Sequence, residues 1–275
     1  MTTVTQAVEQ LVRKTVGLSD ADMGASWAWR MYDEEGLRFA LLMTHHELRD
    51  LAVRLAARRE RVPSQAARIL GQYHQAYRDV SALFASVADA DLDRPPGAGE
   101  WPVRQVGKHM LGAEHGFLMV CRFAVERHRA GNGAEPSDDE WNAYTAPRAR
   151  ERAEALESLD TANVEGIRNT FADIHIRVLR ELFDVTDDEL EKQAWFWDGA
   201  MPLRFRLHRF EEHLRQHSVQ LDKTLAGIGR TPTEAQRLVR NIYNALADVE
   251  MERASAEELR TEFARTIEQR AASLP

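Results

Sequence analysis

Four long stretches of this chain repeat apolar residues every three or four positions, and this spacing constrains the fold more than any other feature. It places the apolar side chains on one face of an α-helix. The stretches cover residues 64–88, 103–129, 163–183 and 203–228. Alternation of apolar and polar residues, which is typical of strands, is hard to find anywhere in the sequence. We therefore predict an all-α protein in which these four helices close one bundle.

The sequence also marks several helix starts. A Ser or Thr followed three positions later by Glu can form a capping box, in which each side chain accepts a hydrogen bond from a free backbone amide of the other residue. Four such pairs occur, and they are Ser137 with Glu140, Thr186 with Glu189, Thr231 with Glu234, and Ser255 with Glu258. We expect a helix to begin at each of them.

These patterns divide the chain into three parts. We expect residues 62–230 to form the four-helix bundle, residues 1–61 an N-terminal helical extension, and residues 231–275 a C-terminal one. A long polar stretch, residues 131–160, is expected to cross the bundle with its own short helix. The extensions also carry apolar positions that need partners, and a closed bundle has little surface left to offer them. Some of these positions are therefore expected to pack across a two-fold interface, in a homodimer.

The charge and the cysteine content exclude several classes of partner. The 36 Lys and Arg residues and 44 Asp and Glu residues give a formal net charge of −8, so phosphate backbones and anionic lipids repel the chain. Its single cysteine cannot form an internal disulfide, and its first residues lack the apolar run of a signal peptide or membrane anchor. We expect a cytoplasmic protein that binds a small-molecule ligand, and neither nucleic acid nor a membrane.

The last of the four predicted helices contains a histidine pair. His213 and His217 are four residues apart, so both imidazoles project from one helix face, about a turn from each other. Such a pair can bind zinc, nickel, copper or iron, although histidine pairs also occur on solvated helix faces. Phe210, Leu214 and Leu221 share or flank this face, which favours an orientation of the imidazoles toward the bundle interior.

A third candidate ligand lies on the second predicted helix. His109 falls between Val106 and Met110, on the apolar stripe. A lone histidine there is usually a core residue with a satisfied hydrogen bond. Cofactor sites in bundles are, however, built from side chains on facing helices, so His109 can meet the pair. Three histidines would leave coordination positions open, as in catalytic rather than structural metal sites.

Other polar residues on these helices are candidates for supporting roles. Glu114, His175, His208 and Glu212 could each orient a ligand imidazole, and Glu114 is also the nearest acidic candidate for proton transfer on its helix. Each has a plainer interpretation as a buried histidine or a solvated helix charge. Cys121 is interpreted as a small core residue, because nothing near it in the sequence indicates a lowered thiol pKa.

Two motifs resemble a known family. The stretch PPGAGEWPVRQVGKHM, which ends at His109 and Met110, resembles the Pro-rich turn, Trp and histidine of the DinB/YfiT-like superfamily. The stretch FEEHLRQHSVQL resembles the superfamily's C-terminal histidine pair. The resemblance covers residues 64–228.

The resemblance implies a fold, a metal and a chemistry. Its members are four-helix bundles, often dimeric, in which three such histidines bind a divalent metal, commonly nickel or zinc. It therefore implies His109, His213 and His217 as ligands. The superfamily also includes thiol-dependent transferases and a maleylpyruvate isomerase that uses mycothiol, so it further implies a low-molecular-weight thiol as a cofactor.

Three functions are compatible with the sequence. The first is a metal-dependent enzyme, such as a thiol S-transferase, isomerase or hydrolase, in which the metal lowers the pKa of a bound water or thiol. The second is a protein that binds a metal or small ligand without turnover, an alternative favoured by the lack of a convincing general base. The third is a structural or stress-related bundle in which the histidines have no function.

Overall fold

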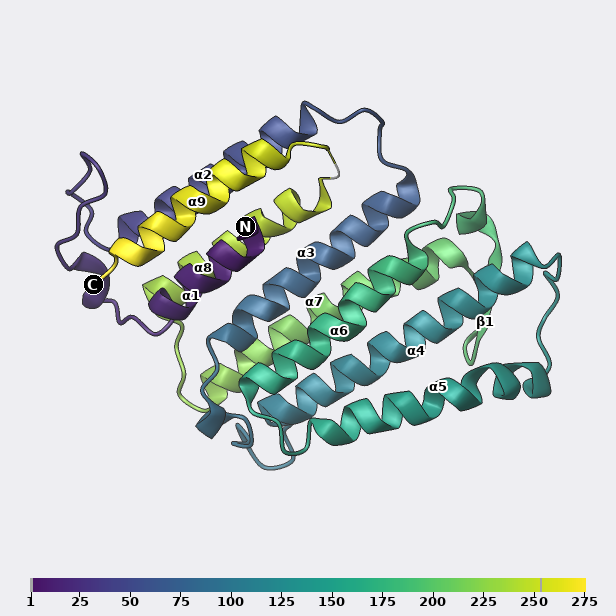
Figure 1. Cartoon of the computed structure of the whole chain (residues 1–275). Helices are drawn as coiled ribbons and strands as arrows, with labels where there is room; N and C mark the ends of the chain where they lie inside the picture. Colours follow the sequence, from purple (N-terminus) through teal and green to yellow (C-terminus); the bar gives the residue numbers. More distant parts are fainter. Residues whose placement is uncertain (1, 253) are drawn as a thin grey trace. The chain divides into compact units, whose positions relative to one another are not determined.

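The computed structural model describes residues 2–252 and 254–275, and within them the chain forms α-helices and one short β-hairpin (Figure 1). This confirms the predicted all-α class. The α-helices are α1 (Val4–Thr15), α2 (Arg38–Ala56), α3 (Gln65–Ala85), α4 (Val103–Arg129), α5 (Asp138–Ser158), α6 (Val164–Leu182), α7 (Leu203–Gly227), α8 (Glu234–Met251) and α9 (Glu257–Ser273). Single 3-10 turns lie at Asp22–Gly24, Asp89–Asp91 and Glu189–Glu191.

The described residues group into two compact units. Unit 1 combines the segments 1–62, 78–86 and 230–275, and unit 2 combines 63–77 and 87–229. Helix α3 therefore contributes its first part to unit 2 and its last part to unit 1. None of the helices in the described part of the chain combines the length and the hydropathy that a bilayer-spanning segment needs.

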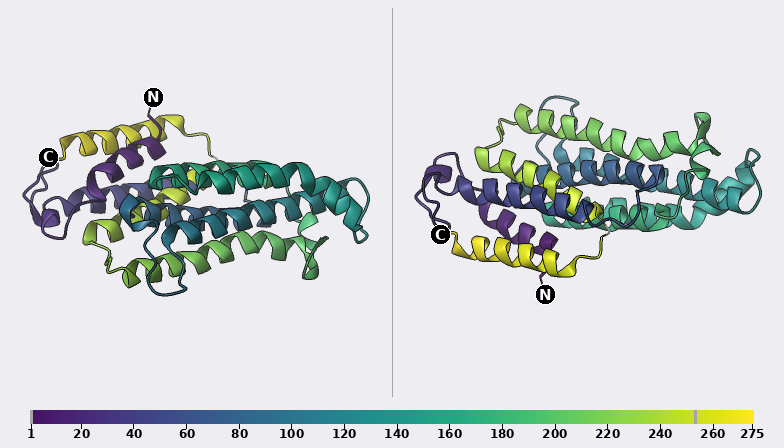
Figure 2. Two further views of the ribbon diagram at one scale, coloured as in Figure 1. Left: turned by 90° about the horizontal axis from the view of Figure 1, so that it is seen from below. Right: turned by 90° about the horizontal axis from the view of Figure 1, so that it is seen from above.

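Unit 2 is a helical bundle centred on α4. Helix α4 packs against α6 and α7, and these helices run along one another in Figure 1 and in both views of Figure 2. Tyr73 brings the first part of α3 into this bundle, because its ring lies 5.1 Å from that of Phe210 on α7 and 4.7 Å from that of His175 on α6. Cys121 is buried among the core residues of α4, as its sequence context indicates.

Helix α5 differs from the short crossover helix that the sequence predicts. It has 21 residues, and none of them is fully buried. The Ser137–Glu140 capping box begins it as expected. Polar contacts connect it to α4, since Arg152 Nε donates to the Gly112 carbonyl at 3.1 Å and Arg127 pairs with Glu140 at 2.6 Å. A helix without a buried apolar stripe gives no periodic signal, which explains why its length could not be predicted.

A two-stranded antiparallel hairpin precedes α7. Strands β1 (Gln193–Phe196) and β2 (Gly199–Pro202) are too short to give a period-two pattern in the sequence. Gly199 ends the turn with a φ of +96°, a conformation that favours glycine. The buried Arg206 of α7 binds the turn through both Asp198 oxygens, at 2.9 and 2.6 Å, and through the Gly199 carbonyl at 2.7 Å. These contacts connect the hairpin to the first turns of α7.

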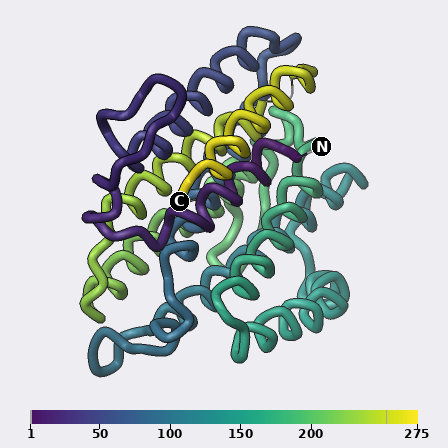
Figure 3. The backbone as a smooth tube through the Cα atoms, turned by 60° about the vertical axis from the view of Figure 1, so that its left-hand side comes forward, coloured from purple at the N-terminus to yellow at the C-terminus, as the bar shows by residue number. Residues whose placement is uncertain are grey.

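Unit 1 brings the two ends of the chain together. Helix α2 packs on α8 and α1 packs on α9, so the N-terminal segment lies beside the C-terminal one (Figure 3). Most of the apolar positions that indicated a two-fold interface are fully buried within this unit, namely Leu41, Leu48, Leu51, Leu55, Ile242 and Leu246, whereas Leu238 is partly buried. These positions therefore no longer argue for a homodimer.

Two expected helix starts in this unit are wrong by a few residues. Helix α8 is capped by Thr233, which forms a capping box with Gln236, rather than by Thr231. Helix α9 follows Ala256, whose side chain makes no capping hydrogen bond, rather than Ser255. At Thr186 and Glu189 the reciprocal hydrogen bonds do form, but they open a single 3-10 turn instead of a longer helix.

Candidate metal centre

Three histidines converge where α4 and α7 pack together. The Nε2 atom of His213 lies 3.1 Å from Nε2 of His109 and 3.1 Å from Nε2 of His217. Each of the three rings offers one nitrogen atom, and these three atoms all lie within 4.8 Å of one another. The two helices hold the rings in this arrangement because His213 and His217 are one turn apart on α7 and His109 faces them from α4.

The spacing of these nitrogens suits a metal ion. Three imidazoles that each bind an ion at about 2.0–2.1 Å place their nitrogens roughly 2.9–3.4 Å apart, for angles between octahedral and tetrahedral. The 3.1 Å separations fall within this interval. The donor set is also one that zinc and nickel accept, so the residues present fit the metal that the sequence resemblance implies.

The electrostatics of the cluster keep the imidazoles neutral. Burial, together with smaller effects of the neighbouring His217, His109 and Arg209, lowers the pKa of His213 to about 3. Burial also lowers the pKa of His109 and of His217. A neutral imidazole keeps the lone pair that a metal requires, so the three rings are in the binding form at neutral pH.

The cluster is open on one side. His213 and His217 are buried, whereas His109 is exposed to solvent. The site therefore lies at the edge of the helix packing rather than fully inside the bundle. Solvent therefore reaches the cluster on the side of His109.

Gln220 fixes the ring of His217. Its Oε1 atom accepts a hydrogen bond from Nδ1 of His217 at 2.7 Å, so the proton of the neutral ring is on Nδ1 and Nε2 keeps its lone pair. Sequence analysis missed this residue. The three-residue spacing on one helix face, which brings such side chains together, is the signal that could have identified it.

We expect Gln220→Ala to weaken metal affinity about 10–100-fold, as for other residues that orient a ligand histidine. Without the acceptor, His217 loses its fixed tautomer and ring orientation. A competition titration with a chromogenic chelator measures the change, and Gln216→Ala, an exposed position on the same helix, is the matched control. Equal affinity in the Gln220 variant and the control would show that the hydrogen bond does not orient the ligand.

The four residues predicted to support the ligands lie elsewhere. Glu114 is buried beside Tyr73, and Glu212 is exposed and pairs with Arg209 at 2.6 Å. His175 is bonded through Nε2 to Nδ1 of His74 at 2.8 Å.

His208 is half-buried on α7, and in the described residues no hydrogen bond or ring contact joins it to the three histidines. Within the same residues, Nδ1 of the buried His213 has no hydrogen-bond partner. Among the contacts to the ligand candidates, only that of Gln220 has the geometry expected of a supporting residue.

Aromatic side chains border the cluster. The Trp101 ring lies 5.2 Å from that of His109, and the Phe117 ring meets that of His213 edge-on at 5.5 Å. The guanidinium of Arg209 lies over Phe117, 5.7 Å from the ring centre. Two aromatic rings and the Arg209–Glu212 ion pair therefore lie next to the cluster.

Comparison with known proteins identifies the family. The model of the DinB superfamily matches residues 72–221, which is more than half of the chain and includes all three histidines. The chain belongs to the DinB superfamily. Among solved structures, the protein described as "YfiT from Bacillus subtilis is a probable metal-dependent hydrolase with an unusual four-helix bundle topology" is 20% identical, with a TM-score of 0.43. That alignment covers 63% of this chain and 93% of YfiT. The search of curated proteins found no significant match to this DinB member.

Proposed function

We propose that this DinB superfamily member binds a divalent metal, zinc or nickel, through His109, His213 and His217, and that it is a metal-dependent hydrolase or thiol-dependent transferase. The observation that carries the proposal is the meeting of three neutral imidazoles, with Nε2 separations of 3.1 Å, in a cluster whose His109 is exposed to solvent. When bound, such a metal polarises a substrate oxygen or lowers the pKa of a bound water or thiol.

Other residues of the chain would orient a ligand histidine, exclude water and bind the substrate. Gln220 holds the proton of His217 on Nδ1, which directs the Nε2 lone pair toward the other two rings. Trp101 and Phe117 border the site with apolar surface that excludes water from part of it. Arg209, beside Phe117, offers a positive charge to an anionic group of a substrate.

A second candidate function is binding without turnover. In the described residues, no carboxylate belongs to the group of ligand atoms within 4.8 Å of one another that the three imidazoles form. This observation favours a protein that sequesters or senses a metal or small ligand. A purely structural bundle would need no converging imidazoles. A cytoplasmic location, a thiol cofactor and a homodimer stay predictions.

Two assays on the purified protein separate these functions. We expect stoichiometric zinc or nickel by elemental analysis, and metal-dependent turnover of either a p-nitrophenyl ester or a thiol with an electrophilic acceptor such as monochlorobimane. Turnover should disappear on chelation and return when metal is restored. Stoichiometric metal without turnover of either substrate class would favour the binding protein. A folded protein that takes up no metal would contradict both functions.

A further inference from the structure

A second cleft lies on a different side of α4, between α5 and α6. It has a volume of about 360 Å³, within the range of sites that bind small molecules. His115 of α4 forms part of it, six residues beyond His109, and the other lining residues belong to α5 and α6. No residue of the three-histidine cluster lines this cleft.

His115 is placed as a donor to a ligand in this cleft. The residue is 91% buried, since its exposed fraction is 9%. Neither ring nitrogen has a hydrogen-bond partner within residues 2–252 and 254–275, although the side chain lines the cleft. Buried polar groups are generally hydrogen-bonded, so this imidazole lacks a partner that the cleft could supply.

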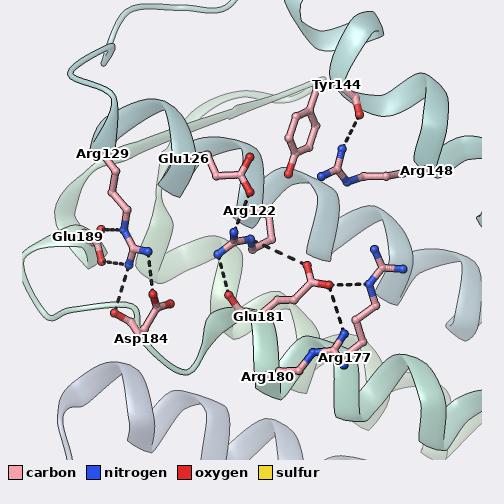
Figure 4. A network of polar contacts seen from close by, with 10 residues as sticks. All are labelled: Arg122, Glu126, Arg129, Tyr144, Arg148, Arg177, Arg180, Glu181, Asp184 and Glu189. Carbon is pink, nitrogen blue, oxygen red and sulfur yellow. Dashed lines mark hydrogen bonds and ion pairs between the residues drawn. The ribbon is translucent and has the colours of Figure 1, made fainter.

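Arginines and carboxylates lie side by side next to His115. Figure 4 shows Arg122, Arg177 and Arg180 around the carboxylate of Glu181, at 3.9, 2.7 and 3.8 Å, and Arg122 also pairs with Glu126 at 2.7 Å. Arg148 lies over the Tyr144 ring at 3.9 Å and donates to the Tyr144 carbonyl at 2.8 Å (Figure 4).

Within the described residues Arg148 has no carboxylate partner, and the buried Tyr144 hydroxyl has no hydrogen-bond partner. Arg122, Arg148, Arg177 and His115 line a smaller neighbouring recess of about 10 Å³ together with Glu151 and Glu181. In the larger cleft the lining charges balance, with Arg177 and Arg180 against Glu151 and Asp173, so an added anion must take the place of one of these carboxylates.

One carboxylate at the rim occupies the position that a ligand would take. Glu151 of α5 pairs with Nη1 of Arg177, while its own side chain is 54% exposed. Exposed ion pairs contribute little stability, so another carboxylate can displace this one. Asp173 is the other acidic residue that lines the cleft, and it is exposed.

The rest of the cleft offers an apolar wall. Ala155 of α5 and Ile174 and Ile176 of α6 line it, and Ile176 is 59% exposed. A ligand with a short apolar body would cover part of this surface while its charged end reached Arg177 and His115.

We propose that the cleft between α5 and α6 binds a small organic carboxylate, whose anionic end replaces Glu151 on Arg177 and accepts a hydrogen bond from His115, and whose apolar body lies against Ile174 and Ile176. This site is separate from the histidine cluster, and its occupancy requires no metal.

Hexanoate is the probe that tests this site. Calorimetry and the imidazole resonances of His115 should report saturable binding at one site, in chelator-treated and untreated protein alike. Acetate, which lacks the apolar body, should bind at least about 10-fold more weakly. No response of the His115 resonances at saturating hexanoate would overturn the proposal.

Variants with opposite expected effects make the test specific. Glu151→Gln should tighten hexanoate binding about 3–10-fold, because the competing carboxylate is gone. Arg177→Gln should weaken it at least about 10-fold, because a charge-assisted bond is lost. His115→Phe, which keeps the ring but removes the donor, should weaken it as well.

Arg150→Gln is the matched control, since Arg150 lies on α5 next to Glu151, is 86% exposed and pairs with Glu154. It should leave the affinity unchanged. If Arg177→Gln loosens α5, seen as lost helicity, the Glu151 and His115 variants still decide the matter. Unchanged or weaker binding by Glu151→Gln, or binding by His115→Phe equal to that of the original protein, would refute the proposal.

Discussion

Replacing His213 by Ala is expected to abolish stoichiometric metal binding and to leave a folded helical protein. His213 is the middle ligand candidate, with Nε2 at 3.1 Å from both other rings, so its loss leaves two imidazoles that no longer share a neighbour. The fold should survive because buried apolar residues of α4 and α7, such as Val106, Met110 and Leu214, supply the packing. Elemental analysis gives the metal content and circular dichroism gives the helicity.

His208→Ala is the matched control for that variant. His208 lies on the same helix and makes no hydrogen bond or ring contact to the three histidines within the described residues. It should retain the metal. Full metal content in the His213 variant would remove that residue from the ligand set. Global unfolding of the variant would instead mean that the cluster, and not the apolar core, holds this part of the bundle together.

The second prediction with a large expected effect concerns Glu114. Its replacement should change the free energy of unfolding rather than metal binding. Its carboxyl group is fully buried in unit 2, and neither oxygen has a well-formed hydrogen bond in the described residues. Burial raises the pKa of Glu114 from 4.5 to about 8, and the nearby Tyr73 hydroxyl lowers it by less. The group is therefore protonated in the folded protein at neutral pH.

The sign of the pH dependence follows from this shift. Between pH 4.5 and 8 the folded chain holds a proton on Glu114 that the unfolded chain releases. The free energy of unfolding therefore falls as the pH rises, by at most about 1.4 kcal/mol per pH unit. Below pH 4.5 both states are protonated and the contribution disappears.

Glu114→Gln removes this ionisation, so the variant should be about 2–4 kcal/mol more stable than the original protein at pH 8 and about equally stable near pH 4.5. Urea unfolding at the two pH values measures the difference. Glu154→Gln, at an exposed position of α5, should change stability by less than about 0.5 kcal/mol at both. A Glu114 variant that is less stable than the original protein at pH 8 would show that the ionised carboxylate has a partner in the folded chain.

Much of unit 2 could be predicted from local sequence patterns. Helix α4 occupies the predicted range 103–129, because its apolar stripe runs through its whole length. Helices α6 and α7 end within a residue or two of their predicted limits for the same reason. The meeting of His109 with His213 and His217 was predicted from their positions on apolar faces. A resemblance in two motifs supported the same three residues.

Features that depend on contacts between distant segments could not be predicted. The apolar faces of the N- and C-terminal helices look the same in sequence whether they pack within one chain or between two chains, and only the structure shows α2 against α8. The surroundings of Glu114 and His175 could not be predicted either, because helix position does not reveal which neighbouring helix a side chain meets. The cleft near His115 depends on α5, whose polar contacts leave no periodic pattern.

The most direct test of the account is X-ray absorption spectroscopy at the metal edge of the purified protein. We predict a zinc or nickel ion bound by three imidazole nitrogens at about 2.0–2.2 Å, with the remaining positions held by oxygen or by an added thiol. The imidazole signal should be lost from the His213→Ala protein. A spectrum of the original protein without imidazole scattering, or a stoichiometric metal that persists unchanged in that variant, would contradict the assignment of His109, His213 and His217 as the metal site.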